Sequence, residues 1–189
     1  MEKFRFPSRE AFVNRRADLE RLEAWWRDDT RDALCVYGRR RVGKSWLFRR
    51  FADGKRAVVL VADERAPGPQ FARFADQVGE LIGMRPAIED AASLVRALYR
   101  LGRDGPLLAV IDEFPLLLPR GPARRVALSS VAAVMEEERD ASHTKLLLCG
   151  SIISQMESLL AQESPLHGRV QPLDVHPMTF AEAAELLES

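Results

Sequence analysis

Residues 33–45 read ALCVYGRRRVGKS, and this stretch decides the fold. Its first five residues, Ala33–Tyr37, form an apolar run typical of a buried strand. The loop Gly38-Arg39-Arg40-Arg41-Val42-Gly43-Lys44-Ser45 follows, and the segment WLFRRFA at 46–52 has the composition of a helix. A strand, a loop of pattern G-x-x-x-x-G-K-S and a helix form the arrangement that cradles phosphate groups. The sequence therefore predicts a phosphate-binding loop at this point.

The residue types in this loop suit that chemistry. Glycines let the backbone wrap a phosphate with its N–H groups turned inward, and the N-terminus of the following helix adds positive potential. Lys44 is expected to reach the β- and γ-phosphates, and the Ser45 hydroxyl to ligate Mg²⁺. Two interpretations stay open for Arg39, Arg40 and Arg41. Their side chains are either solvated or in contact with nucleic acid or a protein partner. The candidate nucleotide-binding segment comprises Gly38, Arg39, Arg40, Arg41, Val42, Gly43, Lys44, Ser45 and Trp46.

Outside the loop, short apolar runs alternate with longer amphipathic segments. Such alternation predicts an α/β fold with a mostly parallel five-stranded sheet covered by helices on both faces, a three-layer α/β/α arrangement. The expected strands are 33–37, 57–62, 107–111, 145–149 and 170–175. The expected helices are 15–27 with Asn14 as N-cap, 45–52, 69–82, 88–101, 124–139, 152–161 and 179–187.

Two other expected strands end in polar residues. The run at 107–111 is followed by Asp112 and Glu113, and the run at 145–149 by Gly150 and Ser151. In a parallel sheet these ends lie at the same edge as the phosphate loop, where ligands bind. Asp112 is a candidate ligand of Mg²⁺, and Glu113 a candidate base for the attacking water. Ser151 either faces the γ-phosphate and the water or caps the next helix, and both roles are compatible.

Composition excludes several classes of protein. The chain has 189 residues, of which 47% are hydrophobic, and its 28 basic residues balance its 28 acidic ones. A disordered chain is thereby excluded, and the balanced charge does not imply a uniformly basic nucleic-acid-binding surface, although it leaves a local basic patch open. Cys35 and Cys149 lie in apolar runs and are expected to be buried free thiols. No apolar run approaches the roughly 20 residues of a membrane helix, and the N-terminus lacks a secretory signal, so we expect a cytoplasmic protein.

The combination of these segments resembles the P-loop ATPases of the AAA+ and STAND group, which carry an extra strand between the phosphate loop and the acidic strand. It is most similar to the archaeal-type ATPase family. Four segments carry the resemblance: Phe12-Val13-Asn14-Arg15 with Asp18-Leu19, Val36 to Ser45, Ile111-Asp112-Glu113-Phe114-Pro115, and Ser164-Pro165-Leu166-His167-Gly168-Arg169.

The resemblance implies ATP and Mg²⁺ as ligands and adds further candidate residues. Residues 12–19 correspond to a box beside the adenine, which makes Val13, Asn14 and Arg15 candidates for base or phosphate contact; the alternative is a capped first helix with an exposed arginine. Arg169 falls where the family has an arginine acting on the γ-phosphate, in cis or from a neighbouring subunit; the alternative is a surface arginine.

The resemblance also divides the chain into an ATPase core at 1–178 and the start of a truncated helical lid at 179–189. Two functions follow as hypotheses: Mg²⁺-dependent ATP hydrolysis with Glu113 activating water, and a nucleotide-binding switch with little turnover. A homo-oligomer or a separate lid or effector chain is a possible partner. Nucleic acid is implied only through the family, whose members carry winged-helix modules.

Overall fold

The parallel sheet forms the centre of the molecule and has the predicted strand number. The computed structural model describes residues 15–30 and 33–177. Strand β1 (Ala33–Tyr37) pairs in parallel with β4 (Thr144–Gly150) and with β5 (Gln171–Asp174). Strand β3 (Leu107–Asp112) lies between β4 and β2 (Ala57–Val61), also in parallel, which gives the order β2-β3-β4-β1-β5. The strand that was expected between the loop strand and the acidic strand is thus β4.

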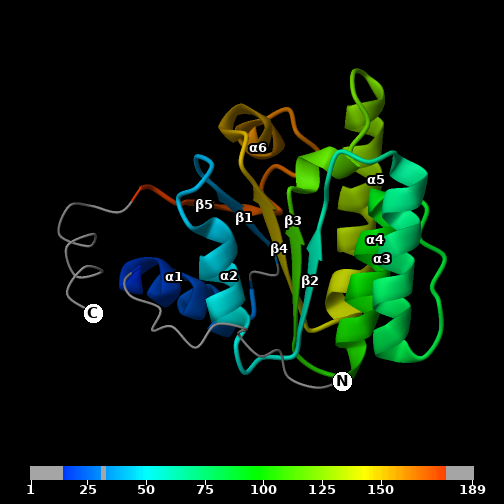
Figure 1. Cartoon of the computed structure of the whole chain (residues 1–189), viewed down its shortest axis with the longest axis horizontal. Helices are drawn as coiled ribbons and strands as arrows, with labels where there is room; N and C mark the ends of the chain where they lie inside the picture. The colour runs from blue at the N-terminus through cyan, green and yellow to red at the C-terminus, as the bar shows by residue number, and fades with distance from the viewer. Residues whose placement is uncertain (1–14, 31–32, 178–189) are drawn as a thin grey trace.

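Helices cover both faces of the sheet, so the predicted three-layer fold is confirmed (Figure 1). Helices α1 (Arg16–Arg27) and α2 (Lys44–Ala52) pack on one face. Helices α3 (Pro67–Ile82), α4 (Ala91–Leu101) and α5 (Ala123–Glu138) pack on the other. Helix α6 (Ile153–Leu160) follows β4 at the carboxyl edge of the sheet, the upper edge in Figure 1. Three short 3-10 helices, η1 (Gly102–Asp104), η2 (Phe114–Leu117) and η3 (Arg139–Ala141), were not predicted.

Alternate residues of β1, β2, β3 and β4 contact one or the other of two hydrophobic cores, as strands covered on both faces require, whereas the edge strand β5 contributes only Leu173. In β3, Leu108 and Val110 face α1 and α2, whereas Ile111 faces α3–α5. Cys35 and Cys149 belong to opposite cores and are free, buried thiols, as predicted. Burial raises the pKa of Cys35 to about 12, and burial followed by the nearby Asp112 raises the pKa of Cys149 well above its usual value.

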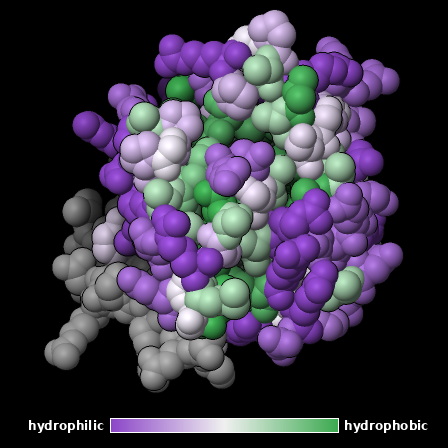
Figure 2. Space-filling model, turned by 90° about the vertical axis from the view of Figure 1, so that its right-hand side faces the viewer, coloured by the Kyte–Doolittle hydropathy of each residue, from purple (hydrophilic) through white to green (hydrophobic). Residues whose placement is uncertain are grey.

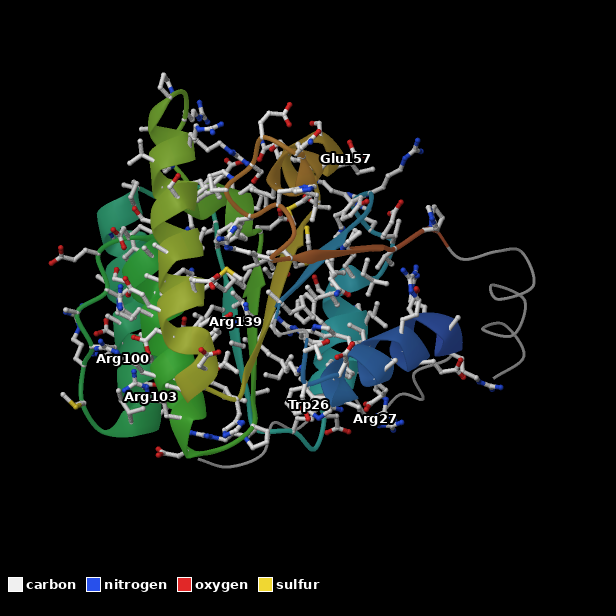
Figure 3. All side chains as sticks on the ribbon, turned by 180° about the vertical axis from the view of Figure 1, so that it is seen from behind. Trp26, Arg27, Arg100, Arg103, Arg139 and Glu157 are labelled. Carbon is white, nitrogen blue, oxygen red and sulfur yellow. The ribbon has the colours of Figure 1, made fainter. Side chains whose placement is uncertain are left out.

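Helix α5 has arginines in its first turn and glutamates in its last, the reverse of what the helix dipole favours. Tertiary contacts compensate at the C-terminal end, where the buried Glu138 accepts hydrogen bonds from Arg96, Arg100 and Arg103. Arg100 and Arg103 lie together at the end of α4 (Figure 3). These contacts join the last turn of α5 to α4 and η1, so Glu138 contributes to the packing of the two helices.

Most element boundaries differ from the prediction by one to three residues, and two differences have a clear cause. Helix α4 begins at Ala91, three residues later than expected, because Asp90 and Ser93 form a reciprocal capping box. Helix α1 begins at Arg16 with Arg15 as its N-cap; the expected cap Asn14 lies outside the described residues, as do Val13 and the expected helix 179–187. The predicted domain boundary at 178 falls where the described residues end.

The face formed by α3–α5 carries hydrophobic side chains among hydrophilic ones (Figure 2). On this side, a groove of about 430 Å³ between the end of α3 and α4 is lined by residues including Ile82, Met84 and Leu101. None of the candidate site residues lines this groove. Within residues 15–30 and 33–177, no helix is both long and apolar enough to span a membrane.

Candidate functional site

The phosphate loop begins where β1 ends and is packed directly against the chain beyond β5. Gly38 has a φ of +149°, and a Cβ atom there would overlap the backbone carbonyl oxygen of Val175. Val175 is itself fixed, because its N–H donates to the Tyr37 carbonyl at 2.7 Å. Only glycine fits this close approach, which explains the first glycine of the motif. The loop ends at Gly43, the N-cap of α2.

Lys44 is the first residue of α2 and lies within the loop. Its side chain is buried, and Nζ donates to the carbonyl oxygens of Gly38 and Arg39 at 2.7 and 2.9 Å. A buried ammonium is tolerated only where such acceptors surround it. The loop therefore holds a fixed positive charge beside its backbone N–H groups, which suits an anionic ligand.

Ser45 and Asp112 come from different elements and meet at the carboxyl edge of the sheet. Ser45 Oγ donates to Asp112 Oδ2 at 3.0 Å, and the Asp112 carboxylate is almost fully buried. Mg²⁺ prefers octahedral oxygen ligands at 2.0–2.1 Å, so two adjacent ligands lie about 2.9 Å apart. The two oxygens therefore fit as neighbouring ligands of one Mg²⁺ ion. Among the described residues, no group of three or more His, Cys, Asp and Glu side chains is arranged to hold a metal.

Glu113 follows Asp112 in a left-handed backbone conformation with a φ of +55°. Its own N–H donates to Asp112 Oδ1 at 3.1 Å, and its Oε2 accepts the backbone N–H of Ser151 at 3.2 Å. Ser151 Oγ in turn accepts from Arg40 Nε at 3.3 Å. Glu113 and Ser151, the two residues that we expected near the attacking water, thus link the end of β3 to the end of β4 and to the phosphate loop. The N-cap of α6 is Ile152, so capping by Ser151 was wrong.

These groups line an open hollow of about 600 Å³, within the usual range for a small-molecule site. Trp46 lies at this hollow and is 52% exposed. The hollow also reaches residues that we did not predict, Asp63 and Glu64 beyond β2, Leu116 of η2 and Ile152. Asp63 and Glu64 follow the apolar run at 57–62, the same pattern that indicated Asp112 and Glu113. The full lining comprises Arg40, Arg41, Gly43, Lys44, Ser45, Trp46, Asp63, Glu64, Asp112, Glu113, Leu116, Ser151 and Ile152.

Arg15 is buried, which contradicts the alternative interpretation of an exposed arginine beside a capped helix. It is 4% exposed, and its guanidinium donates to Asp18 Oδ2 at 2.9 Å, to the His176 carbonyl at 2.9 Å and to the Val42 carbonyl. The side chain therefore contacts the phosphate loop through a backbone carbonyl. Arg15 is absent from the lining of the hollow.

Arg169 lies at the opposite edge of the sheet, which contradicts a role on the γ-phosphate in cis. It precedes β5 and shares a hollow with Ala33 at the start of β1 and with Arg139. Figure 3 shows Arg139 far below Glu157 of α6, the helix at the carboxyl edge. Arg169 contacts Glu136 Oε2 at 3.6 Å and the Pro165 carbonyl at 3.2 Å. The sequence motif identified this arginine in the chain. It did not show that the segment before β5 lies at the amino edge of the sheet, away from the phosphate loop.

The parallel α/β sheet, the glycine-rich loop with its lysine and the paired Ser45 and Asp112 define a nucleotide-binding protein of the Walker type. The comparisons agree with this class. Residues 12–189 match the family described as an ATPase domain predominantly from Archaea, and the chain belongs to that family.

Two proteins are similar to this chain in sequence, and one solved structure is similar in fold. The uncharacterized protein MJECL04 of Methanocaldococcus jannaschii is 30% identical over 176 residues, which cover 92% of this chain and 38% of that protein. The uncharacterized ATP-binding protein MJ0423 of the same organism is 44% identical over 45 residues, covering 24% of this chain and 76% of that protein. The Walker-type ATPase paby2304 of Pyrococcus abyssi has a similar fold, with a TM-score of 0.66 and 21% identity, over 100% of this chain and 59% of that structure. The chain thus spans 38% and 59% of the lengths of MJECL04 and paby2304.

Proposed function

We propose that this chain binds ATP with Mg²⁺ and hydrolyses it at the hollow beside the phosphate loop. The observation that carries this proposal is the 3.0 Å contact between Ser45 Oγ and Asp112 Oδ2. It brings the loop helix and the acidic strand together with two oxygen ligands at the spacing that one Mg²⁺ ion needs. Membership of an ATPase family supports ATP as the nucleotide.

Each residue has a separate task in this proposal. The loop N–H groups and Lys44 bind phosphate oxygens, and Ser45 and Asp112 hold the metal ion, which when bound neutralises charge on the phosphates. The Glu113 carboxylate accepts a proton from water while the water oxygen bonds to the γ-phosphorus. The bond from the γ-phosphorus to the oxygen bridging it to the β-phosphate breaks, and ADP and phosphate are the products.

One observation favours the alternative of a nucleotide-binding switch. The carboxylate of Glu113 already accepts the Ser151 N–H at 3.2 Å, and Ser151 Oγ is engaged by Arg40. A base held in this way has part of its acceptor capacity occupied, which slows proton transfer until the contact is released. In the switch, binding of nucleotide without prompt turnover is the functional state.

The test is to measure binding and turnover on the same samples. Fluorescent ATP and GTP analogues are titrated with Mg²⁺ into wild type, Lys44→Ala and Glu113→Gln, and phosphate release is followed in parallel. Glu64→Gln is a matched control, because Glu64 lines the same hollow from the β2 side.

For an ATPase we expect that Lys44→Ala abolishes binding, and that Glu113→Gln binds ATP but releases at least about 100-fold less phosphate, the usual contribution of a general base. Glu64→Gln should retain turnover. Tight binding with no release by wild type supports the switch. A folded wild-type protein that binds neither nucleotide refutes both functions.

A further inference from the structure

Arg15 contacts the phosphate loop but does not line the hollow. Its Nη2 donates both to the carbonyl of Val42 within the loop and to the carbonyl of His176 beyond β5. Its Nη1 pairs with Asp18 Oδ2 at 2.9 Å. One buried guanidinium thus joins the start of α1, the loop and the chain that leaves the sheet.

The contact with Val42 fixes the direction of one peptide group. The described residues contain no cis peptide bond, so the N–H of Gly43 points opposite to the C=O of Val42. Because Arg15 holds that carbonyl on its own side, the Gly43 N–H is turned the other way. Gly43 lines the hollow and Arg15 does not. The N–H groups of a phosphate loop must face the anion, and a cation on the outward carbonyl enforces that orientation.

Backbone strain around the site is consistent with such a constraint. Within residues 15–30 and 33–177, positive φ angles outside glycine occur only at Arg15, Arg41 and Glu113, with values of 63°, 66° and 55°. Arg41 and Glu113 line the hollow, and Arg15 contacts the phosphate loop. Each such conformation costs about 1–3 kcal/mol and persists only where surrounding contacts impose it.

We infer that Arg15 is a positioning residue, which orients the Val42–Gly43 peptide so that the Gly43 N–H faces the bound phosphates. The role rests on the proposed nucleotide function, but it differs from direct contact with base or phosphate. Lysine is a poor substitute, because a single ammonium lacks the planar fork that reaches two carbonyls and a carboxylate together.

The experiment first measures the orientation of the Val42–Gly43 peptide by NMR and then the affinity for nucleotide. In nucleotide-free, ¹⁵N- and ¹³C-labelled wild type, a scalar coupling across the hydrogen bond from Arg15 Nη2 to the Val42 carbonyl carbon is expected. The ¹⁵N resonance of Gly43 should move in Arg15→Lys and Arg15→Gln, whose folding is checked by thermal unfolding. The control is Arg16→Ala, since Arg16 is the exposed neighbour on α1. It should leave the Gly43 resonance in place.

The affinity for ADP and for ATP should fall at least about tenfold in both Arg15 variants, the loss expected for one charge-assisted hydrogen bond. Arg16→Ala should stay within about twofold of wild type. Because Glu113 is untouched, kcat at saturating ATP should fall less than the affinity, which separates positioning from general loss of structure.

Absence of the coupling in wild type overturns the inference even if the variants do not fold. An unmoved Gly43 resonance or unchanged ADP affinity in folded Arg15 variants also overturns it. If wild type shows the coupling but binds no nucleotide, the peptide is held as described and the proposed function fails instead.

Discussion

Replacement of Gly38 by alanine should disrupt both the fold and the site, and a second glycine separates the two causes. Gly38 has a φ of +149°, and its added Cβ would overlap the Val175 carbonyl oxygen. Gly105 has a φ of +136°, but a Cβ there would meet no atom within 4 Å. Both substitutions place a side chain at a positive φ, and only Gly38→Ala adds the steric overlap.

The magnitudes follow from these two terms. A side chain at such a φ costs about 1–3 kcal/mol, which applies to both variants. Forcing apart atoms of a packed backbone adds about 1–3 kcal/mol at Gly38. The Val175 carbonyl cannot simply turn aside, because the N–H of the same residue is bonded to Tyr37 at 2.7 Å. Gly38→Ala should therefore be less stable than Gly105→Ala by about 1–3 kcal/mol.

Urea unfolding measures this difference, and thermal unfolding should show a lower Tm by about 2–4 °C for each kcal/mol. Titration with a fluorescent ATP analogue should show weakened binding only in Gly38→Ala, since Gly105 lies at the amino edge of the sheet, in the turn before β3. Equal losses of stability in the two variants would refute the argument, because the overlap at Val175 would then carry no cost.

Three further predictions concern other parts of the molecule. Burial raises the pKa of Glu138, but hydrogen bonds from Arg103 and Arg100 outweigh it, so the net pKa lies below its usual value. The stability that this carboxylate contributes is present above the unfolded pKa of about 4.3 and is lost as pH falls through the folded value. In urea unfolding, Glu138→Gln should therefore lose about 1–3 kcal/mol at neutral pH and show a weaker decline in acid; an unchanged acid profile would contradict this. Cys35 and Cys149 should resist a thiol reagent at about pH 8 until the protein unfolds, because burial raises both pKa values; rapid labelling of folded protein would argue against it. Arg169→Ala should change the turnover of dilute protein by less than about twofold, because this arginine lies at the edge away from the phosphate loop, and a large loss would place it at the site.

The sequence alone was sufficient to locate the strands and most of the residues that line the hollow. Strands buried on both faces are apolar throughout, and short apolar runs located β1 to β4 to within one residue at each end. The edge strand β5, with the sequence QPLD, was located with the same accuracy from a run at 170–175 that also contains polar residues. The phosphate loop is a contiguous motif whose chemistry depends on local backbone geometry, so Gly38, Lys44 and Ser45 were found from spacing. Asp112 and Glu113 were found because parallel strands bring their carboxyl ends to one edge.

Only the tertiary structure decided which distant groups meet. Two hydrogen bonds illustrate this: Ser151 N–H donates to Glu113, 38 positions away, and Arg15 donates to the Val42 carbonyl, 27 positions away. Each bond involves a backbone group, and because every residue type carries such groups, the sequence does not indicate which of them will be bonded. Arg169 is a second example of what the sequence could not decide. Its motif is present in the sequence, but the chain before β5 places this arginine at the edge of the sheet away from the phosphate loop. Local patterns determine which elements form, because their energetics depend on near neighbours. The positions of side chains between elements depend on how the whole chain packs, and that information exists only in three dimensions.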